Sequence, residues 1–581
     1  MSIGPVTFSL PKTTGTHGDV LAAVGLADLL QAATETVVRL SDEGTFIAVY
    51  LAETVLWDSL PATAGYPFLK VSITAKVPGG VTEYVDYPAE RERAARYYQA
   101  RKAARRVDED TLALVEEDRP RPDWRLWQVL NTLQGDETTN KVHLRIAQTR
   151  PEKLRGEVLE ALHRLAAGKP THSDWPATGV QLFSPNAAKG YSRLKPDSTG
   201  RNDKTKEQWV DPFVEWLKYR GYFRIACPFF EGKRGENIHL LCPVPGDIAV
   251  RALEDISGRL NRIGVYGGPP KMDALAVLRL AALLIRHSEE YAEDPLTRIP
   301  HLSVAGKSPG KIISELLVTH YQSLGQSRAI SAMFRLAVPS WFDIYSDEDA
   351  HEWLAILQEH EAVIRGLHDD RSDEIGLLIR YRHFLERRGE SAGREFVEFL
   401  EHYGPFLLRA REQRRRPRAF QTDRVRRIIV ANDARLAEIL DNPGFAAVAS
   451  AVRRSTVSAQ AQKAMGIQDY REIRYNLLHD LRRKRSLPGT EFLESISEFI
   501  SLYNAENARR RELKLRAPSN VTTEELHAFA RLMDRYGAAV VGALLCAYGS
   551  CREPREPEIS TAASEEEDES NAPVDVTESS E

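Results

Sequence analysis

A chain of 581 residues with 42% hydrophobic and 28% charged residues is long and apolar enough to form two to four ordinary globular domains. Its four cysteines are too few and too scattered for a disulfide framework, which excludes the small disulfide-rich secreted class and favours a cytoplasmic protein. We expect neither a secretory signal nor a membrane span, because the N-terminus lacks a basic segment followed by an apolar one and no apolar run approaches about 20 residues.

Residues 1–270 predict an α+β domain that begins the chain. Amphipathic or charged periodicity predicts helices at residues 16–40, 90–106, 120–167 and 209–219. β-branched and aromatic residues predict strands at residues 46–51, 68–77, 223–230 and 237–244. The last two strands are separated by a glycine-containing turn and therefore predict a hairpin.

Residues 184–207, SPNAAKGYSRLKPDSTGRNDKTKE, predict a polar loop, because they are rich in Gly, Pro, Ser and Asn and have no apolar period. Lysine and arginine on such a loop can reach phosphates and groove edges of DNA, and an ordinary surface loop is the alternative interpretation. The candidate DNA-binding residues here are Asn186, Lys189, Arg193, Lys195, Arg201 and Lys204.

The strand signal ends near residue 271, so residues 271–411 predict a helical middle region. Six helices are expected in it, at residues 273–286, 311–321, 329–336, 351–365, 373–387 and 392–403. A basic connector with prolines, residues 412–427, then leads into the last ordered unit. The predicted fold is therefore an α+β N-terminal domain followed by a mainly α-helical C-terminal half.

Residues 412–552 predict a basic helical bundle. Its helices are expected at residues 445–465, 470–484, 490–507 and from Thr522 onward, where Thr522 and Glu525 form a capping-box pattern. From Pro405 to Arg552 there are 27 Lys/Arg and 16 Asp/Glu, a net charge of +11. Phosphate contacts dominate the affinity of proteins for nucleic acids, so this cationic surface indicates a polyanion ligand. A solvated charged face is the alternative.

The candidate DNA-binding residues of the bundle lie on helix faces or at helix ends, where they are expected to hold the DNA backbone without reading bases. They are Arg453, Arg454, Arg474, Arg482, Arg483, Lys484, Arg485, Arg509 and Arg510. After the bundle, residues 553–581 carry 11 acidic residues and one Arg, and this composition predicts a disordered acidic tail.

Two motifs that resemble catalytic patterns are incomplete. The triplet Gly306-Lys307-Ser308 lacks the glycine that a phosphate-binding loop has five residues earlier, where this chain has His301. His479 and Asp480 form a His-Asp pair inside an amphipathic helix without further ligand motifs. A metal-dependent nuclease or phosphohydrolase that uses this pair remains an alternative, but we expect no catalytic residue.

Three potential zinc ligands, Cys227, His239 and Cys242, lie on the predicted hairpin. They could approach one another across it, but a structural zinc site normally needs a fourth protein ligand. Buried cysteine is the better interpretation, and we expect neither a metal nor a cofactor.

Three stretches carry a family resemblance. They are residues 15–30 (GTHGDVLAAVGLADLL), residues 184–197 (SPNAAKGYSRLKPD) and residues 451–507, which contain AVRRSTVSAQAQKAMG, YREIRYNLLHDLRRKR and EFLESISEFISLYNAEN. In pattern and order they resemble the large subunits of type I CRISPR interference complexes (Cascade). The resemblance implies a non-catalytic subunit whose N-terminal domain checks the protospacer-adjacent motif in duplex DNA, while a small-subunit-like C-terminal bundle stabilises the R-loop.

The same resemblance implies the partners of the chain. They are a guide CRISPR RNA, target double-stranded DNA, the backbone and RNA-end-binding proteins and small subunits of Cascade, and a separate helicase–nuclease. A helical DNA-binding scaffold or regulator unrelated to CRISPR is the alternative. In several complexes of this family the C-terminal bundle is also made separately as a small subunit, for which a start near Val430 would keep all helices of the last unit.

Overall fold

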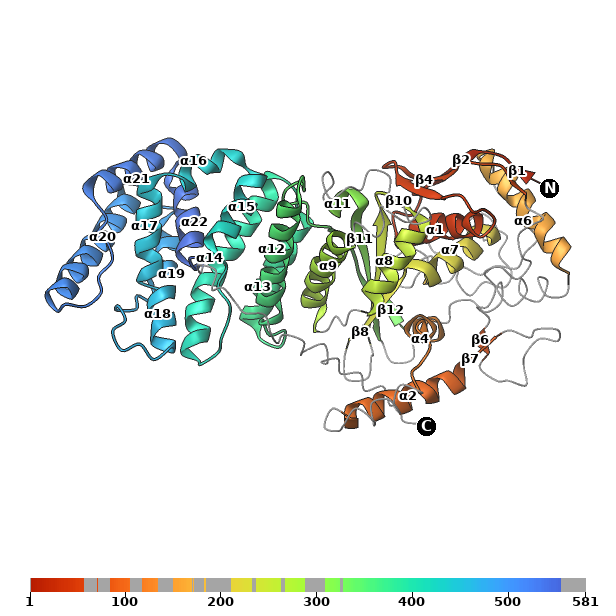
Figure 1. The fold of residues 1–581 in the computed structure, drawn as a ribbon, viewed down its shortest axis with the longest axis horizontal. Coiled ribbons are helices and arrows are strands. Elements are labelled where there is room, and N and C mark those ends of the chain that lie inside the picture. Colours follow the sequence, from red (N-terminus) through yellow and green to blue (C-terminus); the bar gives the residue numbers. More distant parts are fainter. Residues whose placement is uncertain are drawn as a thin grey trace.

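The chain folds into strands with helices at one end and helices alone at the other (Figure 1). The computed structural model describes residues 2–56, 70–71, 84–104, 118–133, 150–169, 171, 182–183, 211–231, 237–262, 267–287, 309–323 and 328–554. The acidic tail predicted at residues 553–581 lies outside this part except for its first two residues. No described helix combines the length and the hydropathy that crossing a bilayer requires.

The first sheet has four antiparallel strands in the order β10-β3-β4-β2. These strands are β2 (Val6–Pro11), β3 (Arg39–Asp42), β4 (Phe46–Leu51) and β10 (Asp247–Ala249). The edge strand β10 arrives about 200 residues after β3, so this sheet is complete only when distant parts of the chain have met. Two short pairs also form, β1 (Ser2–Ile3) with β5 (Val55–Leu56) and β6 (Lys70–Val71) with β7 (Val85–Asp86).

The second sheet is also antiparallel, in the order β12-β11-β9-β8. Its strands are β8 (Cys227–Glu231), β9 (Asn237–Pro245), β11 (Ile313–Ser323) and β12 (Arg328–Ala337). The predicted hairpin is confirmed as β8 and β9. The predicted helices at residues 311–321 and 329–336 are wrong, and the domain boundary placed at residue 270 divides this sheet.

Helical spacing of apolar residues explains the error. In β11, Ile313, Leu316 and Leu317 stand at positions i, i+3 and i+4, and in β12, Ile330 and Met333 are three apart. β11 is a central strand between β9 and β12, and its side chains are largely buried on both faces of the sheet, so its apolar residues do not need to alternate as they would on a half-exposed strand.

Helices of the N-terminal half cover the two sheets. Their bounds are α1 (His17–Gln31), α2 (Tyr87–Ala104), α4 (Trp124–Thr132), α6 (Pro151–Ala166), α7 (Pro212–Ile225), α8 (Val250–Arg262), α9 (Pro269–Arg286) and α11 (Pro309–Ile312). All fifteen residues of α1 are buried, and α7 lies directly against it. The two backbones touch where Gly25 faces Leu217 and Gly221 faces Leu21.

The C-terminal half is helical from α12 onward, which confirms the predicted fold class. Its elements are α12 (Asp347–Arg365), α13 (Ser372–Glu386), α14 (Glu390–Glu412), α15 (Thr422–Asn432), the 3-10 turn η5 (Ala434–Leu436), α16 (Ala437–Leu440), α17 (Pro443–Arg454), α18 (Val457–Ala464), α19 (Leu477–Lys484), α20 (Gly489–Glu512), α21 (Thr523–Tyr536) and α22 (Ala538–Gly549). The predicted capping box is present, with Glu525 N–H donating to Thr522 Oγ1 at 3.2 Å. The helix predicted at residues 445–465 is instead two helices, separated at Ser455–Thr456.

Helix α14 belongs to the packing of the bundle, although the predicted boundary at residue 412 would exclude it. Gln460 Nε2 donates to the Leu408 carbonyl at 2.6 Å, and Arg485 Nε lies 2.7 Å from Glu401 Oε1. Gly404 of α14 also lies close to Ser550, just after α22. A fragment that began near Val430 would therefore leave apolar surfaces of α18, α19 and α22 exposed to water.

Two histidines are buried as neutral rings. His17 Nε2 donates to the Leu182 carbonyl at 2.6 Å, so its Nδ1 accepts from the Thr319 hydroxyl at 3.0 Å. His360 Nδ1 lies 2.7 Å from the Tyr381 hydroxyl. Burial lowers the pKa of His17 to about 4 and that of His360 to about 3, because an imidazolium ion would lose its hydration there.

We expect the free energy of unfolding to fall as the pH is lowered from about 6.5 towards 4. In this window the unfolded chain protonates His17 and His360 but the folded chain does not, so acid favours unfolding by on the order of 3 kcal/mol per histidine. Urea unfolding at a series of pH values measures this slope. His360→Gln should flatten it, whereas His351→Gln, at an exposed position of the same helix, should not. An unchanged slope in His360→Gln would contradict the assignment.

Candidate nucleic-acid interface and a buried histidine cluster

The basic loop lies outside the described residues, so the prediction that it contacts duplex DNA stays a prediction. This applies to Asn186, Lys189, Arg193, Lys195, Arg201 and Lys204. The described residues on either side fix where the loop begins and ends. Before it, the Phe183 ring packs edge-on against Tyr219 and Tyr222 of α7. After it, Asp211 caps the N-terminus of α7 by accepting from Phe213 N–H at 2.9 Å. Both loop ends therefore lie beside α7.

Three of the candidate bundle arginines bind groups of the protein itself. Arg453 is buried and donates to the Tyr548 carbonyl and to Glu553 Oε1, at 3.3 and 3.2 Å. Arg510 is buried and donates to Asp469 Oδ1 at 2.8 Å, and Arg485 pairs with Glu401. Their guanidinium groups connect separate segments of the bundle, so we leave them out of the proposed interface.

The other six candidates keep their charge without an acidic partner. They are Arg454, Arg474, Arg482, Arg483, Lys484 and Arg509, and within the described residues none of them forms an ion pair. Arg483 and Arg509 are exposed and the other four are half-buried. An unpaired cation can bind a phosphate without first breaking an ion pair of the protein, so these six fit a polyanion best.

Five of these cations are spread along α20, whereas Arg454 lies at the end of α17. Arg482, Arg483 and Lys484 lie in the last turn of α19, shortly before α20 begins, and Arg474 lies over the Phe499 ring near its middle at 5.8 Å. Arg509 lies in its last turn. A helix of 24 residues is about 36 Å long, close to one turn of duplex DNA.

Further cations, not singled out from the sequence, extend this series beyond Arg509. Arg511, Lys514 and Arg516 are exposed, and Arg511 donates only to neutral oxygens, those of Pro518 and Asn520, in the described contacts. The run RRRELKLR at residues 509–516 was the available signal. We name the cationic residues 474, 482–484, 509, 511, 514 and 516 the α20 cationic track.

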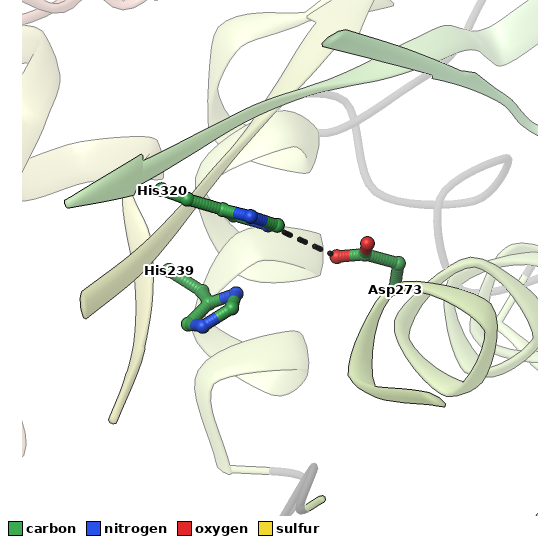
Figure 2. A group of neighbouring side chains, drawn as sticks. All are labelled: His239, Asp273 and His320. Atoms are coloured by element: carbon green, nitrogen blue, oxygen red, sulfur yellow. Dashed lines mark ion pairs between the residues drawn. The ribbon is translucent and has the colours of Figure 1, made fainter. Parts of the chain in front are cut away.

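A second constellation is buried at the second sheet. His239 of β9 and His320 of β11 are direct cross-strand partners, and their ring centroids lie 4.0 Å apart (Figure 2). Asp273, near the start of α9, faces both rings, and its Oδ1 lies 3.6 Å from His320 Nε2. One potential ligand atom from each residue falls within 4.8 Å of the others.

Charged side chains of neighbouring residues contact the cluster. Glu231 Oε2 lies 3.0 Å from His239 Nε2, and this hydrogen bond is the main cause that lowers the pKa of Glu231. Arg382 Nη1 lies 3.7 Å from Asp273 Oδ2. Burial lowers the pKa of His320, so its ring is neutral at pH 7. Sequence analysis singled out His239 but neither Asp273 nor His320, because the three residues are 34 to 81 positions apart and β11 has the apolar spacing of a helix.

The metal and catalytic candidates from the sequence are not brought together. His239 and Cys242 are three residues apart on β9 and therefore point to opposite faces of the sheet, so the zinc set with Cys227 does not form. His479 is exposed and joins no group of three metal-ligating side chains in the described part of the chain. The triplet at residues 306–308 lies outside that part.

The chain matches no protein-family model, and no curated protein is similar enough in sequence to be matched.

Proposed function

We propose that this chain is the non-catalytic large subunit of an RNA-guided CRISPR antiviral surveillance complex in the cytoplasm. In this role it recognises the protospacer-adjacent motif in target DNA, stabilises the R-loop and helps to recruit a helicase–nuclease. The observation that carries the proposal is the α20 cationic track, whose charges have no acidic partners among the described residues. The resemblance of residues 15–30, 184–197 and 451–507 to such subunits supplies the biological setting.

The α20 cationic track is better suited to binding the DNA backbone than to reading bases. Phosphates are reached by charge alone and need little geometry, whereas base edges need bidentate hydrogen bonds from well-oriented side chains. In an RNA-guided complex the guide reads the target by base pairing, so the protein has only to hold the strands and check a short duplex motif. A helical series of unpaired cations meets the first requirement.

The N-terminal half would check the short duplex motif. The described residues on either side of the basic loop, Phe183 and Asp211, both contact α7, which packs on α1. Residues 15–30, one of the stretches that resemble the family, lie beside the last described residues before the loop, since His17 donates to the carbonyl of Leu182. This rigid base fits a loop that probes duplex DNA, with the guide RNA and the other Cascade subunits bound elsewhere.

Neutralising the track should weaken DNA binding by the assembled complex equally for all sequences. In the variant Arg483→Gln/Lys484→Gln/Arg509→Gln we expect the slope of log affinity against log salt concentration to fall by up to about 0.9 for each lost duplex-phosphate contact, or about 0.7 for single strands. Filter binding or fluorescence anisotropy between low and moderate salt measures this slope. A loss confined to one base position would contradict backbone holding.

The matched control removes the same charge from paired arginines of the bundle. Arg426, Arg435 and Arg535 form ion pairs with Asp441, Asp433 and Glu438, respectively, and the three are exposed or half-exposed. Their replacement by Gln should change the salt slope little. If it matches the effect of the track variant, net charge alone explains binding and the track is not the interface. Tight DNA binding by the purified chain without RNA or partner subunits would favour an unrelated DNA-binding regulator.

A further inference from the structure

Four buried polar atoms in the cluster of Figure 2 have no hydrogen-bond partner among the described residues. They are Nδ1 of His239, Nε2 of His320 and both carboxylate oxygens of Asp273. The three residues are only 2%, 7% and 1% exposed. Buried polar atoms are nearly always paired, so a group of them that converges on one point calls for a shared partner.

We propose that His239, His320 and Asp273 bind one divalent transition-metal ion, for which zinc is the best fit. Two imidazoles and one carboxylate are a donor set that zinc accepts, and hard cations such as Mg²⁺ and Ca²⁺ prefer oxygen ligands alone. The 3.6 Å between His320 Nε2 and Asp273 Oδ1 is close to the spacing of about 3.5 Å that two ligands have around a tetrahedral ion at about 2.1 Å.

The contacts of Glu231 and Arg382 with the cluster leave Nδ1 of His239 and Oδ1 of Asp273 available to a metal ion. Glu231 holds Nε2 of His239, and because a carboxylate only accepts, this nitrogen carries the proton and Nδ1 keeps its lone pair. This arrangement of carboxylate, histidine and metal is the usual support of a metal-bound imidazole. On the other side, Arg382 faces Oδ2 of Asp273 and leaves Oδ1 towards His320.

Arg382 also offers an explanation without metal, in which it neutralises Asp273 directly. Its nearest atom lies 3.7 Å from Oδ2, beyond hydrogen-bond distance, and its Nε lies 3.3 Å from Glu386 while the guanidinium lies over the Phe334 ring. Arg382 is therefore shared among several groups and leaves Asp273 without a hydrogen bond. A metal ion satisfies all three inner residues at once.

The position of the ligands would let the ion link two parts of the fold, with one protein ligand fewer than a closed structural zinc site has. His239 and His320 lie on adjacent strands, and Asp273 lies on α9, so the ion would fix α9 to the second sheet. Three protein ligands also leave a position for water on zinc. The site is far in sequence from the α20 cationic track, so its test is independent of the proposed function.

Metal analysis of the untagged full-length chain, purified without chelator, tests the proposal. We expect one zinc ion per chain by mass spectrometry of the metal content. After removal by a chelator, Co²⁺ should bind with visible absorption typical of nitrogen and oxygen ligands and without a thiolate charge-transfer band. Zn²⁺ added to the metal-free chain should raise its Tm, because an ion that binds only the folded state stabilises it. Absence of both Co²⁺ absorption and a Tm shift in the unmodified chain would overturn the proposal.

Variants identify the ligands. His239→Gln and Asp273→Asn should weaken Co²⁺ binding by more than about 100-fold, and Glu231→Gln by roughly 10- to 100-fold. Cys242→Ala is the matched control, because this residue belongs to the zinc set expected from the sequence and faces away from His239. It should bind Co²⁺ as the unmodified chain does. Retained binding in both His239→Gln and Asp273→Asn, or its loss in Cys242→Ala, would assign the metal to other ligands. If a variant fails to fold, the measurements on the unmodified chain still decide.

Discussion

Gly25→Ala and Gly221→Ala are each expected to destabilise the protein strongly, because α1 and α7 touch backbone to backbone at these positions. A Cβ at residue 25 would lie 1.8 Å from the Leu217 carbonyl oxygen, and one at residue 221 would lie 2.0 Å from that of Leu21. These separations are far below van der Waals contact, and a helix backbone cannot yield as a flexible side chain does. Overpacking typically costs about 1–3 kcal/mol, and we expect at least the upper end here.

Urea unfolding of the full-length chain, followed by tryptophan fluorescence, measures this loss in the free energy of unfolding. Gly258→Ala provides the control, since Gly258 lies within α8 and a Cβ there would meet nothing within 4 Å. Alanine is a better helix former than glycine by about 1 kcal/mol, so this variant should be as stable as the original chain or slightly more stable. Equal stability of Gly25→Ala and Gly258→Ala would show that the two helices separate without penalty.

The second large effect is expected at Asp28 of α1. Its side chain and that of Arg220 are only 2% and 1% exposed and form an ion pair, while Arg224 Nε lies 3.0 Å from the other oxygen of Asp28. Burial alone would raise the pKa of Asp28, but the two arginines outweigh it and lower that pKa, so the carboxylate is ionised. Asp28→Asn removes the carboxylate that Arg220 and Arg224 share, and breaking a buried ion pair by removing one partner costs about 3–5 kcal/mol.

Two comparison variants separate the effect of the buried charge from that of side-chain shape. Asp247→Asn breaks the ion pair with Arg39, which is partly exposed on both sides, and should cost less than about 1 kcal/mol. Asp28→Asn combined with Arg220→Met removes both buried charges and should recover a large part of the loss. A double variant as unstable as Asp28→Asn alone would mean that shape, not charge, decides stability at this site.

Sequence reasoning succeeded where local signals and the fold agree. The hairpin pairs two β-rich runs as β8 and β9, and α21 begins at Thr523 because the capping box of Thr522 and Glu525 is encoded within four residues. It failed at β11 and β12, whose apolar spacing is that of a helix. β12 pairs with β11, and β11 in turn pairs with β9, about 75 residues earlier. Nothing in residues 311–337 alone carries that information.

The candidate nucleic-acid interface could likewise be predicted only in part from the sequence. The basic character of the bundle is visible in the sequence, but which arginines are available is not. Arg453 is held by Tyr548 and Glu553, 95 and 100 positions away, and Arg510 by Asp469, 41 positions away, although each looks like its neighbours along the helix. The cluster of His239, Asp273 and His320 is likewise created by the meeting of two strands and a helix.

The complete burial of α1 has a consequence for the order in which the chain is made. Residues 17–31 leave the ribosome early, but α7, which covers them, follows about 190 residues later. At 5–20 residues per second this interval lasts roughly 10 to 40 s, during which β2, β3 and β4 can cover part of α1 but the face that α7 covers has no partner. The nascent N-terminus is therefore a target for chaperones that bind apolar segments, and synthesis that stalls before residue 212 would leave it exposed.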